Sequence, residues 1–171
     1  MEIHTKRLII RYLTLNDLED VFSYASDLEV SRYALWGPNT KEDTHVFLKE
    51  VLENYNKKEI KDYDFGIEYE GKIIGGVSLH IGLHNQAEIG WIIHPNYQGQ
   101  GFATEAAKAI LKFARKKDVA HVIAHCDLRN IASFKVMEKL GMTRKSVAYK
   151  TRYNKLTKQY DLDELTYQMD I

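Results

Sequence analysis

The sequence predicts an α+β fold, in which four to five helices flank a single mixed, mostly antiparallel central sheet of about seven strands. Segments with the two-residue period of strands are separated by segments with the 3.6-residue period of helices. Residues 63–69 and 72–81 follow each other as a hairpin. The strands predicted at 86–93 and 121–126 are joined by a helix, which makes them parallel neighbours. This mixed order of elements is typical of α+β domains.

The first third of the chain is predicted to hold one strand and three helices. Residues 7–13 form the strand, and Thr14 with Asp17 resembles a capping box that opens a helix. A second, short helix is expected from Asp27 to Tyr33. Thr40 begins a third helix. The inward side chains of that helix are predicted to be Val46, Phe47, Val51 and Leu52.

The middle of the chain holds the hairpin and a strand–loop–helix unit. The hairpin turns at Glu70-Gly71, and Gly75-Gly76 interrupts its second strand, which indicates a bulge or a close backbone approach. The 86–93 strand alternates, with Ala87, Ile89, Trp91 and Ile93 on one face. The helix that follows has an apolar stripe. Its members are Ala106, Ala107, Ile110, Leu111, Phe113 and Ala114.

The last third continues the pattern. Residues 121–126 read as a short buried strand. A helix is expected from Asn130 to Leu140, ended by Gly141 because glycine adopts the left-handed conformation that follows many helices. Residues 143–153 and 159–169 are the last two predicted strands.

Length and composition limit the function. The 171 residues are expected to form one domain, residues 1–171. The net charge is zero, which argues against nucleic acid as a general partner. Cys126 is the only cysteine, so no intrachain disulfide forms, as suits a reducing cytoplasm. There is no signal-peptide pattern and no apolar run of about 18 residues, so a cytoplasmic protein without a membrane partner is expected.

A glycine-rich segment, Gln98-Gly99-Gln100-Gly101-Phe102-Ala103-Thr104, joins the 86–93 strand to its helix. Glycine lets the backbone approach a ligand closely, and the free amides of a helix start attract anions, so the segment can hold a phosphate. The spacing alone fits a plain turn capped by Thr104 equally well. The P-loop and dinucleotide motifs need a lysine or a third glycine that is absent. The pattern Q/R-x-x-G-x-G/A is met by Gln98, Gly101 and Ala103.

On this pattern the sequence resembles the GNAT N-acetyltransferase superfamily over nearly the whole chain, and most of all its ribosomal-protein N-terminal acetyltransferases. The context agrees, with Ala-Glu-Ile-Gly-Trp before the loop and Thr-Glu-Ala-Ala after it. The resemblance implies acetyl-CoA as the acetyl donor, with its phosphates on the glycine-rich segment. It also implies that the strands at 86–93 and 121–126 splay apart. Backbone amides of Trp91, Ile92 and Ile93 would then bind the pantetheine arm in the gap.

Acetyl transfer to an amine needs a base that removes a proton from the amine and a group that stabilises the negative charge of the leaving thiolate. Glu88, on the strand beside the gap, is the candidate base, and a solvated strand carboxylate is the alternative. The resemblance assigns Asn130 to the cofactor site. It also places Met137 where many relatives carry the tyrosine that protonates the thiolate. Ser133 is the expected substitute, although Asn130 and Ser133 also fit simple capping roles.

Two other residue groups could in principle bind a metal or act as a nucleophile. His121 and His125 have a spacing that suits zinc on a helix, but on a strand they lie too far apart to share an ion, so no metal is expected. Adjacent strand residues point to opposite faces, so Cys126 is expected in the core, apart from His125. With no convincing nucleophile, the acceptor amine is expected to attack directly, without an acyl-enzyme.

The acceptor is expected to be a primary amine, foremost a protein N-terminal α-amine such as that of a ribosomal protein. At pH 7 an α-amine of pKa near 8 is roughly 10% neutral, whereas a lysine is well under 0.1% neutral, so a weak base suffices. The resemblance places Tyr33 and Trp36 at the acceptor site, with core packing as the alternative for Trp36. A small-molecule amine (an aminoglycoside or polyamine), a non-catalytic acyl-CoA-binding sensor and a homodimer remain open.

Overall fold

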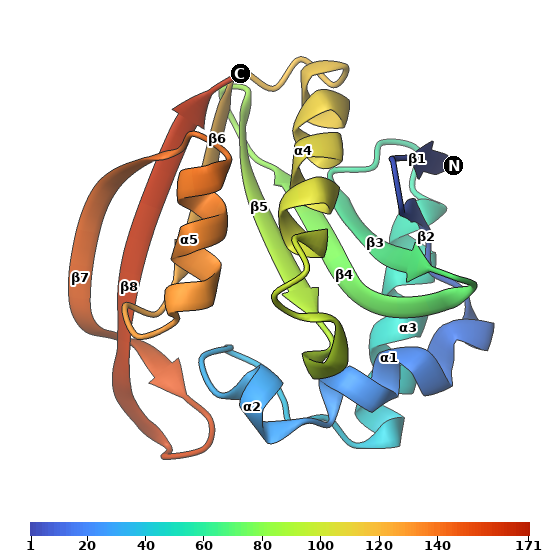
Figure 1. The fold of residues 1–171 in the computed structure, drawn as a ribbon, viewed down its shortest axis with the longest axis horizontal. Helices are drawn as coiled ribbons and strands as arrows, with labels where there is room; N and C mark the ends of the chain where they lie inside the picture. Colours follow the sequence, from blue (N-terminus) through green and yellow to red (C-terminus); the bar gives the residue numbers. More distant parts are fainter.

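The computed structural model describes all 171 residues and contains one eight-stranded sheet with the strand order β1-β2-β3-β4-β5-β6-β8-β7 (Figure 1). The strands are Glu2–His4 (β1), Ile9–Tyr12 (β2), Asp62–Tyr69 (β3), Lys72–Ile81 (β4), Gln86–Ile93 (β5), His121–Cys126 (β6), Thr143–Asn154 (β7) and Gln159–Asp170 (β8). Only β5 and β6 run parallel. The predicted fold class is confirmed, with β1 as the one strand beyond the seven expected.

Five helices flank the sheet. They are Leu18–Ala25 (α1), Leu28–Ser31 (α2), Lys41–Tyr55 (α3), Phe102–Arg115 (α4) and Ile131–Lys139 (α5). Helices α4 and α5 pack on one face of the sheet, and α1 and α3 pack on the other (Figure 1). The helix predicted from Asp27 to Tyr33 is shorter than expected. No helix combines the length and the apolar composition that a membrane crossing requires.

Local signals place the helix ends correctly. The Thr40 hydroxyl accepts from the Asp43 amide at 3.1 Å, and the Asp43 carboxylate accepts from the Thr40 amide at 2.8 Å, so a capping box opens α3. The inward face of α3 was predicted wrongly at Val46, which is 44% exposed. The buried positions are Thr44, Leu48 and Val51, whose spacing of four and three residues follows one face of the helix.

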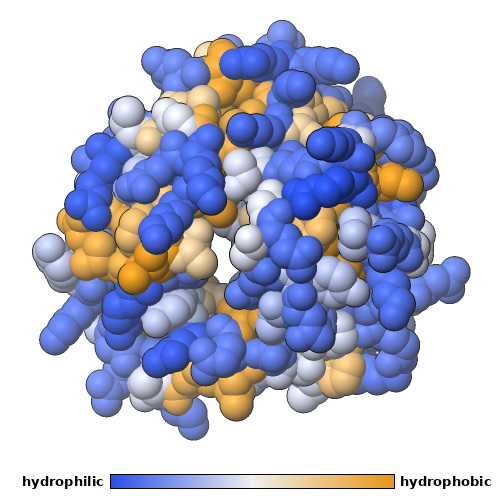
Figure 2. Space-filling model, in the orientation of Figure 1, coloured by the Kyte–Doolittle hydropathy of each residue, from blue (hydrophilic) through white to orange (hydrophobic).

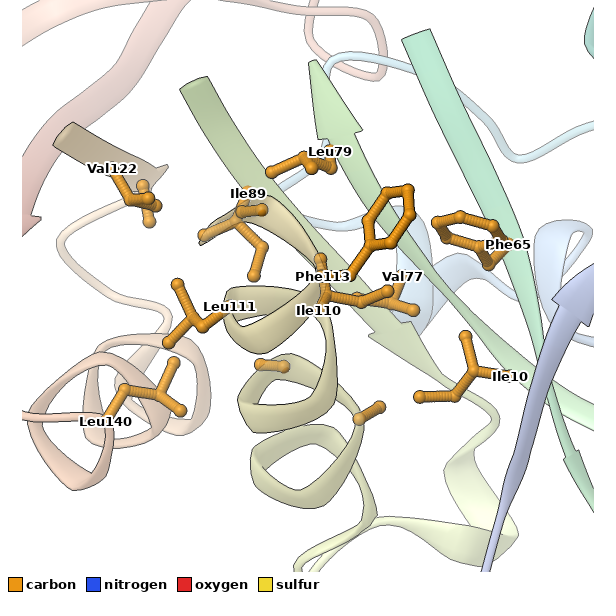
Figure 3. Packing of buried hydrophobic residues seen from close by; sticks show 14 of the residues in the cluster. Ile10, Phe65, Val77, Leu79, Ile89, Ile110, Leu111, Phe113, Val122 and Leu140 are labelled. Atoms are coloured by element: carbon orange, nitrogen blue, oxygen red, sulfur yellow. The ribbon is translucent and has the colours of Figure 1, made fainter. Parts of the chain in front are cut away.

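The larger core lies between the sheet and helices α4 and α5 (Figure 3). The whole predicted apolar stripe of α4 is buried, and Ile110 is 0% exposed. The ring of Phe113 meets Phe65 edge-on, with centroids 5.8 Å apart. Because this packing holds α4 against β3, β4 and β5, the N-terminal end of α4 lies at the end of β5.

The smaller core lies on the opposite face, where α1 and α3 cover the sheet. It contains Leu13, Tyr24 and Leu48, and Ile92 of β5 packs against it from the sheet. Glu88, farther along the same face of β5, is exposed.

Gly75 lets β4 and β5 approach each other at the end where the site is built. It lies opposite Ile93, and a β carbon at Gly75 would collide with the carbonyl oxygen of Ile92. The close approach predicted for Gly75-Gly76 is therefore confirmed, and the register of β3 and β4 shifts beside it, at Ile67 and Glu68.

We predict that Gly75→Ala lowers the free energy of unfolding by about 1–3 kcal/mol, because neither backbone can move aside without disturbing the sheet. Gly82→Ala is the matched control, since its β carbon would meet only the Gln86 carbonyl oxygen, at an ordinary 3.5 Å. Urea unfolding of both variants measures the difference. Equal midpoints would show that the β4–β5 contact tolerates a methyl group.

Candidate functional site

The sheet opens between its two parallel strands. Residues 86–88 of β5 lie opposite residues 121–123 of β6, and the pairing ends there. Residues 89–93 of β5 have no neighbouring strand on that side. Figure 1 shows the two strands diverging, and Figure 2 shows the surface hollowed at this place. The predicted splay is therefore present, and we refer to this opening as the gap.

The free edge of β5 presents backbone donors to the gap. The His94 amide donates to the Ile74 carbonyl of β4 at 2.8 Å, whereas the Ile93 carbonyl accepts from the Gln98 side chain at 2.9 Å, away from β4. Because successive residues of a strand point their backbone groups to opposite sides, the amides of Trp91 and Ile93 face the gap. The Ile92 amide faces β4, so only two of the three predicted amides can bind a group in the gap.

The glycine-rich segment forms a nest of free amides. The amides of Gly99, Gln100 and Gly101 donate no hydrogen bond within the protein. The first bond of α4 runs from the Glu105 amide to the Gly101 carbonyl at 3.0 Å, so residues 102–104 add three more free amides. Gly101, with φ +81°, takes the N-cap position, so Thr104 does not cap this helix. Six successive donors at a helix start form an anion site.

An N-terminal clamp that the sequence did not reveal holds this loop. Arg7 donates to the Gln100 carbonyl at 3.0 Å, pairs with Glu105 at 2.7 Å and covers the ring of Phe102 at 4.3 Å. Thr5 also donates to Glu105, at 2.6 Å. Burial works to raise the pKa of Glu105, but the hydrogen bonds from Thr5 and Arg7 outweigh it and lower that pKa. Nothing local in the sequence signals contacts between residues about a hundred positions apart.

The other wall of the gap is the end of β6 and the start of α5. The Asn130 side chain accepts from the Ser133 amide at 3.1 Å, so Asn130 is the N-cap of α5. Ser133 is half-buried, and its hydroxyl is beside the thiol of Cys126. Burial raises the pKa of Cys126 to about 11, although the contact with Ser133 partly opposes this. Met137 is 1% exposed and belongs to the core.

An ion pair between the buried Asp127 and the half-exposed Arg129 fixes the loop between β6 and α5. The carboxylate of Asp127 is fully buried and accepts from the Arg129 amide, from its guanidinium at 2.8 and 3.0 Å, and from the Asp163 amide at 2.8 Å. Arg129 in turn lies 5.6 Å from the ring of Tyr33. The sequence analysis did not predict this pairing of Asp127 with Arg129. Through its contact with Arg129, Tyr33 joins the segment after α2 to the β6 wall of the gap. Trp36, in the same segment, is 37% exposed, so the alternative that it packs in the core is wrong.

Glu88 stands at the mouth of the gap. It occupies the last paired position of β5, opposite His80 of β4, and its side chain is exposed. His80 lies 3.1 Å from Asp62 on β3. His121 and His125 bond separately to Asp170 and Thr166, and no group of three His, Cys, Asp or Glu side chains is arranged to hold a metal ion.

Comparisons with known proteins identify the family. A family model described as an acetyltransferase (GNAT) domain matches residues 7–143. The chain belongs to the GNAT acetyltransferase family. This GNAT chain is 39% identical over 148 residues to the uncharacterized N-acetyltransferase YnaD of Bacillus subtilis (strain 168), with 84% of each chain covered.

Solved structures agree with this assignment. A GNAT-family acetyltransferase from Bacillus anthracis is 31% identical, with a TM-score of 0.86 over 99% of this chain and 98% of that one. RimL, a ribosomal L7/L12 alpha-N-protein acetyltransferase, has a TM-score of 0.87 at 18% identity, over 100% of this chain and 94% of that one. At that identity the likeness to RimL is one of fold.

As a GNAT N-acetyltransferase, the protein uses acetyl-CoA as its acetyl donor. The residues present fit that molecule. The six free amides of residues 99–104 suit a pyrophosphate, and the amides of Trp91 and Ile93 suit the amide groups of pantetheine. The gap between β5 and β6 leaves room for the pantetheine arm along the free edge of β5.

We predict that Glu105→Gln weakens acetyl-CoA binding by about tenfold, equivalent to ~1.4 kcal/mol, because Arg7 loses the partner that aims it at the loop. Calorimetry with acetyl-CoA measures the effect. Lys6→Gln is the control, since Lys6 is exposed and forms no ion pair. If both variants bind as the wild type does, the clamp does not shape the loop.

We also predict that Cys126 reacts slowly with a thiol reagent in the folded protein. At pH 8 a thiol of pKa about 11 is roughly 0.1% thiolate, compared with about 25% for a free cysteine. The rate should therefore be at least ~100-fold below that of free cysteine. Unfolding in urea should restore the normal rate, and a fast reaction without urea would contradict the burial of this thiol.

Proposed function

We propose that this enzyme acetylates a primary amine, foremost the N-terminal α-amine of a cytoplasmic protein such as a ribosomal protein. The observation that carries the proposal is the position of Glu88, a free and exposed carboxylate at the residue where β5 and β6 part. An amine that approaches the gap from this face meets Glu88 before it reaches the thioester. The carboxylate is therefore available as a general base.

The proposed reaction is a direct attack. The amine nitrogen bonds to the thioester carbonyl carbon, the carbon–sulfur bond breaks, and the amine proton passes to Glu88, directly or through a water molecule. Ser133 donates a hydrogen bond to the departing thiolate, which leaves with the electron pair of the broken bond. The buried Met137 cannot donate a proton, so Ser133 is the nearest hydroxyl on α5 for this role.

An acyl-enzyme through Cys126 is disfavoured by the surroundings of that thiol. Cys126 is 5% exposed, and burial keeps its pKa near 11, so almost none of it is the nucleophilic thiolate at neutral pH. Its side chain also faces the core on the α5 side of the sheet, whereas Glu88 faces the opposite side.

An α-amine suits this weakly assisted site. Glu88 is solvated, and an amine of pKa near 8 already has a neutral fraction of roughly 10% at pH 7. Tyr33 and Trp36 are proposed to contact the acceptor, because the segment that carries them reaches across the end of the gap to Arg129 (Figure 1). A small-molecule amine is the second candidate, favoured by the carboxylates that share the face with Glu88.

The proposal is tested first by acetyl-CoA binding and then by turnover. We predict that Gly101→Glu abolishes acetyl-CoA binding in calorimetry, because it adds a negative charge to the amide nest. A thiol-release assay with N-terminal peptides and small amines then identifies the acceptor. Glu88→Gln should lower kcat/KM by roughly 100-fold or more while leaving acetyl-CoA binding unchanged.

Gly141→Glu is the matched control for the binding step. Gly141 has φ +85°, close to the +81° of Gly101, and is remote from the glycine-rich loop, so it reproduces the backbone strain without the charge at the nest. If Glu88→Gln turns over normally, Glu88 is not the base. If acetyl-CoA binds and no amine releases CoA, the protein is an acyl-CoA-binding sensor instead.

A further inference from the structure

On the face of the sheet that carries Glu88, a row of small and polar residues leads from the gap towards β3, and we refer to this row as the trough. In this row, Gly90 of β5 lies opposite Ser78 of β4, and Ser78 lies opposite Asp64 of β3. Gly90 has no side chain, and a β carbon there would lie 2.9 Å from the Ser78 hydroxyl oxygen. The Ser78 hydroxyl therefore leans over Gly90 towards the gap, and no side chain of β5 blocks the way to it.

A tyrosine hydroxyl without a partner borders this trough. Tyr24 of α1 is only 4% exposed, and its hydroxyl makes no hydrogen bond within the protein. The hydroxyl oxygen lies 3.7 Å from the position that a β carbon on Gly76 would take, one row from Ser78 on the same face. The Tyr24 side chain is buried as a whole and its hydroxyl has no partner in the protein, so the hydroxyl is available to a ligand in the trough.

The trough ends at a carboxylate that lacks a counter-ion. Asp64 is half-buried, and no side chain donates to or pairs with its carboxylate. Burial raises the pKa of Asp64, His80 works against this, and Asp62 adds to it. The charged groups near it on this face are Asp62 of the same strand, His80 of β4 and, one strand farther, Glu88 of β5. No lysine or arginine of the chain neutralises this group.

We propose that Asp64, Ser78 and Tyr24 form an acceptor subsite for a second cationic group. This inference rests on the proposed function, since it places the reacting amine in the gap beside Glu88. Asp64 lies two strands from the free edge of β5, which corresponds to roughly 10 Å at the usual strand spacing. The preferred acceptor therefore carries an ammonium or guanidinium group about 10 Å from the amine that is acetylated.

This chemistry has two sources, which the experiment separates. A linear diamine or polyamine carries its second ammonium on the same chain, whereas a protein N-terminus would supply it from a basic side chain. Binding to the enzyme–CoA complex is measured by calorimetry with a seven-carbon diamine, a three-carbon diamine and heptylamine. Peptides with lysine, norleucine or glutamate at the second position form the other series.

If the source is a diamine, the seven-carbon diamine should bind at least tenfold more tightly than heptylamine or the three-carbon diamine. If the source is a protein, the lysine peptide should bind more tightly than the norleucine and glutamate peptides. Asp64→Asn should remove this preference and leave heptylamine binding unchanged. Tyr24→Phe should reduce the preference less. Asp170→Asn, the loss of one exposed carboxylate elsewhere, is the charge-matched control.

A thermal melt of Asp64→Asn separates this role from a structural one. A carboxylate whose pKa is raised by folding destabilises the folded state at pH 8, so the asparagine variant should melt at the same or a higher temperature. The inference is overturned if neither the seven-carbon diamine nor the lysine peptide binds more tightly than its comparison compounds. It is also overturned if Asp64→Asn weakens the binding of all acceptors equally. Because binding is measured without turnover, a failure of the subsite is distinguishable from the absence of acetyl transfer.

Discussion

The early end of the β5–β6 pairing is the constraint on which the rest of the site depends. A strand edge inside a sheet normally satisfies its backbone groups with a neighbour, and leaving them unpaired is costly unless another partner binds them. Here the pairing stops at Glu88, so the amides of Trp91 and Ile93 face an opening rather than a strand. The opening, the donors along it and the carboxylate at its mouth all follow from this one interruption.

The two walls of the opening are held by separate parts of the chain. On the β5 side, Gly75 permits a close contact with β4, and the clamp from Arg7 to Glu105 secures the glycine-rich loop. On the β6 side, the buried Asp127 binds Arg129, which reaches Tyr33 across the end of the gap. Each wall is therefore held in place without a contact that would close the gap. The amide nest lies at the β5 wall, and Ser133 lies at the start of α5 on the other wall.

Much of this could be predicted because its signals are local. The apolar stripe of α4, the capping box at Thr40 and the glycine that ends α5 are each specified within a few residues. The rest depends on long-range contacts or on register. β1 is too short to show a period, Arg7 and Glu105 are brought together only by the fold, and the direction of the Ile92 amide follows from its pairing with β4. The motif indicated where the site lies, but not what holds it.

The central claim is that the gap and the amide nest together receive acetyl-CoA. The most direct test is amide hydrogen exchange, followed residue by residue with and without acetyl-CoA. The structure predicts new protection at Trp91, Ile93 and residues 99–104, with no change at Ile92, whose amide already faces β4. Protection confined to other parts of the chain, or equal protection of Ile92 and its two neighbours, would contradict this account.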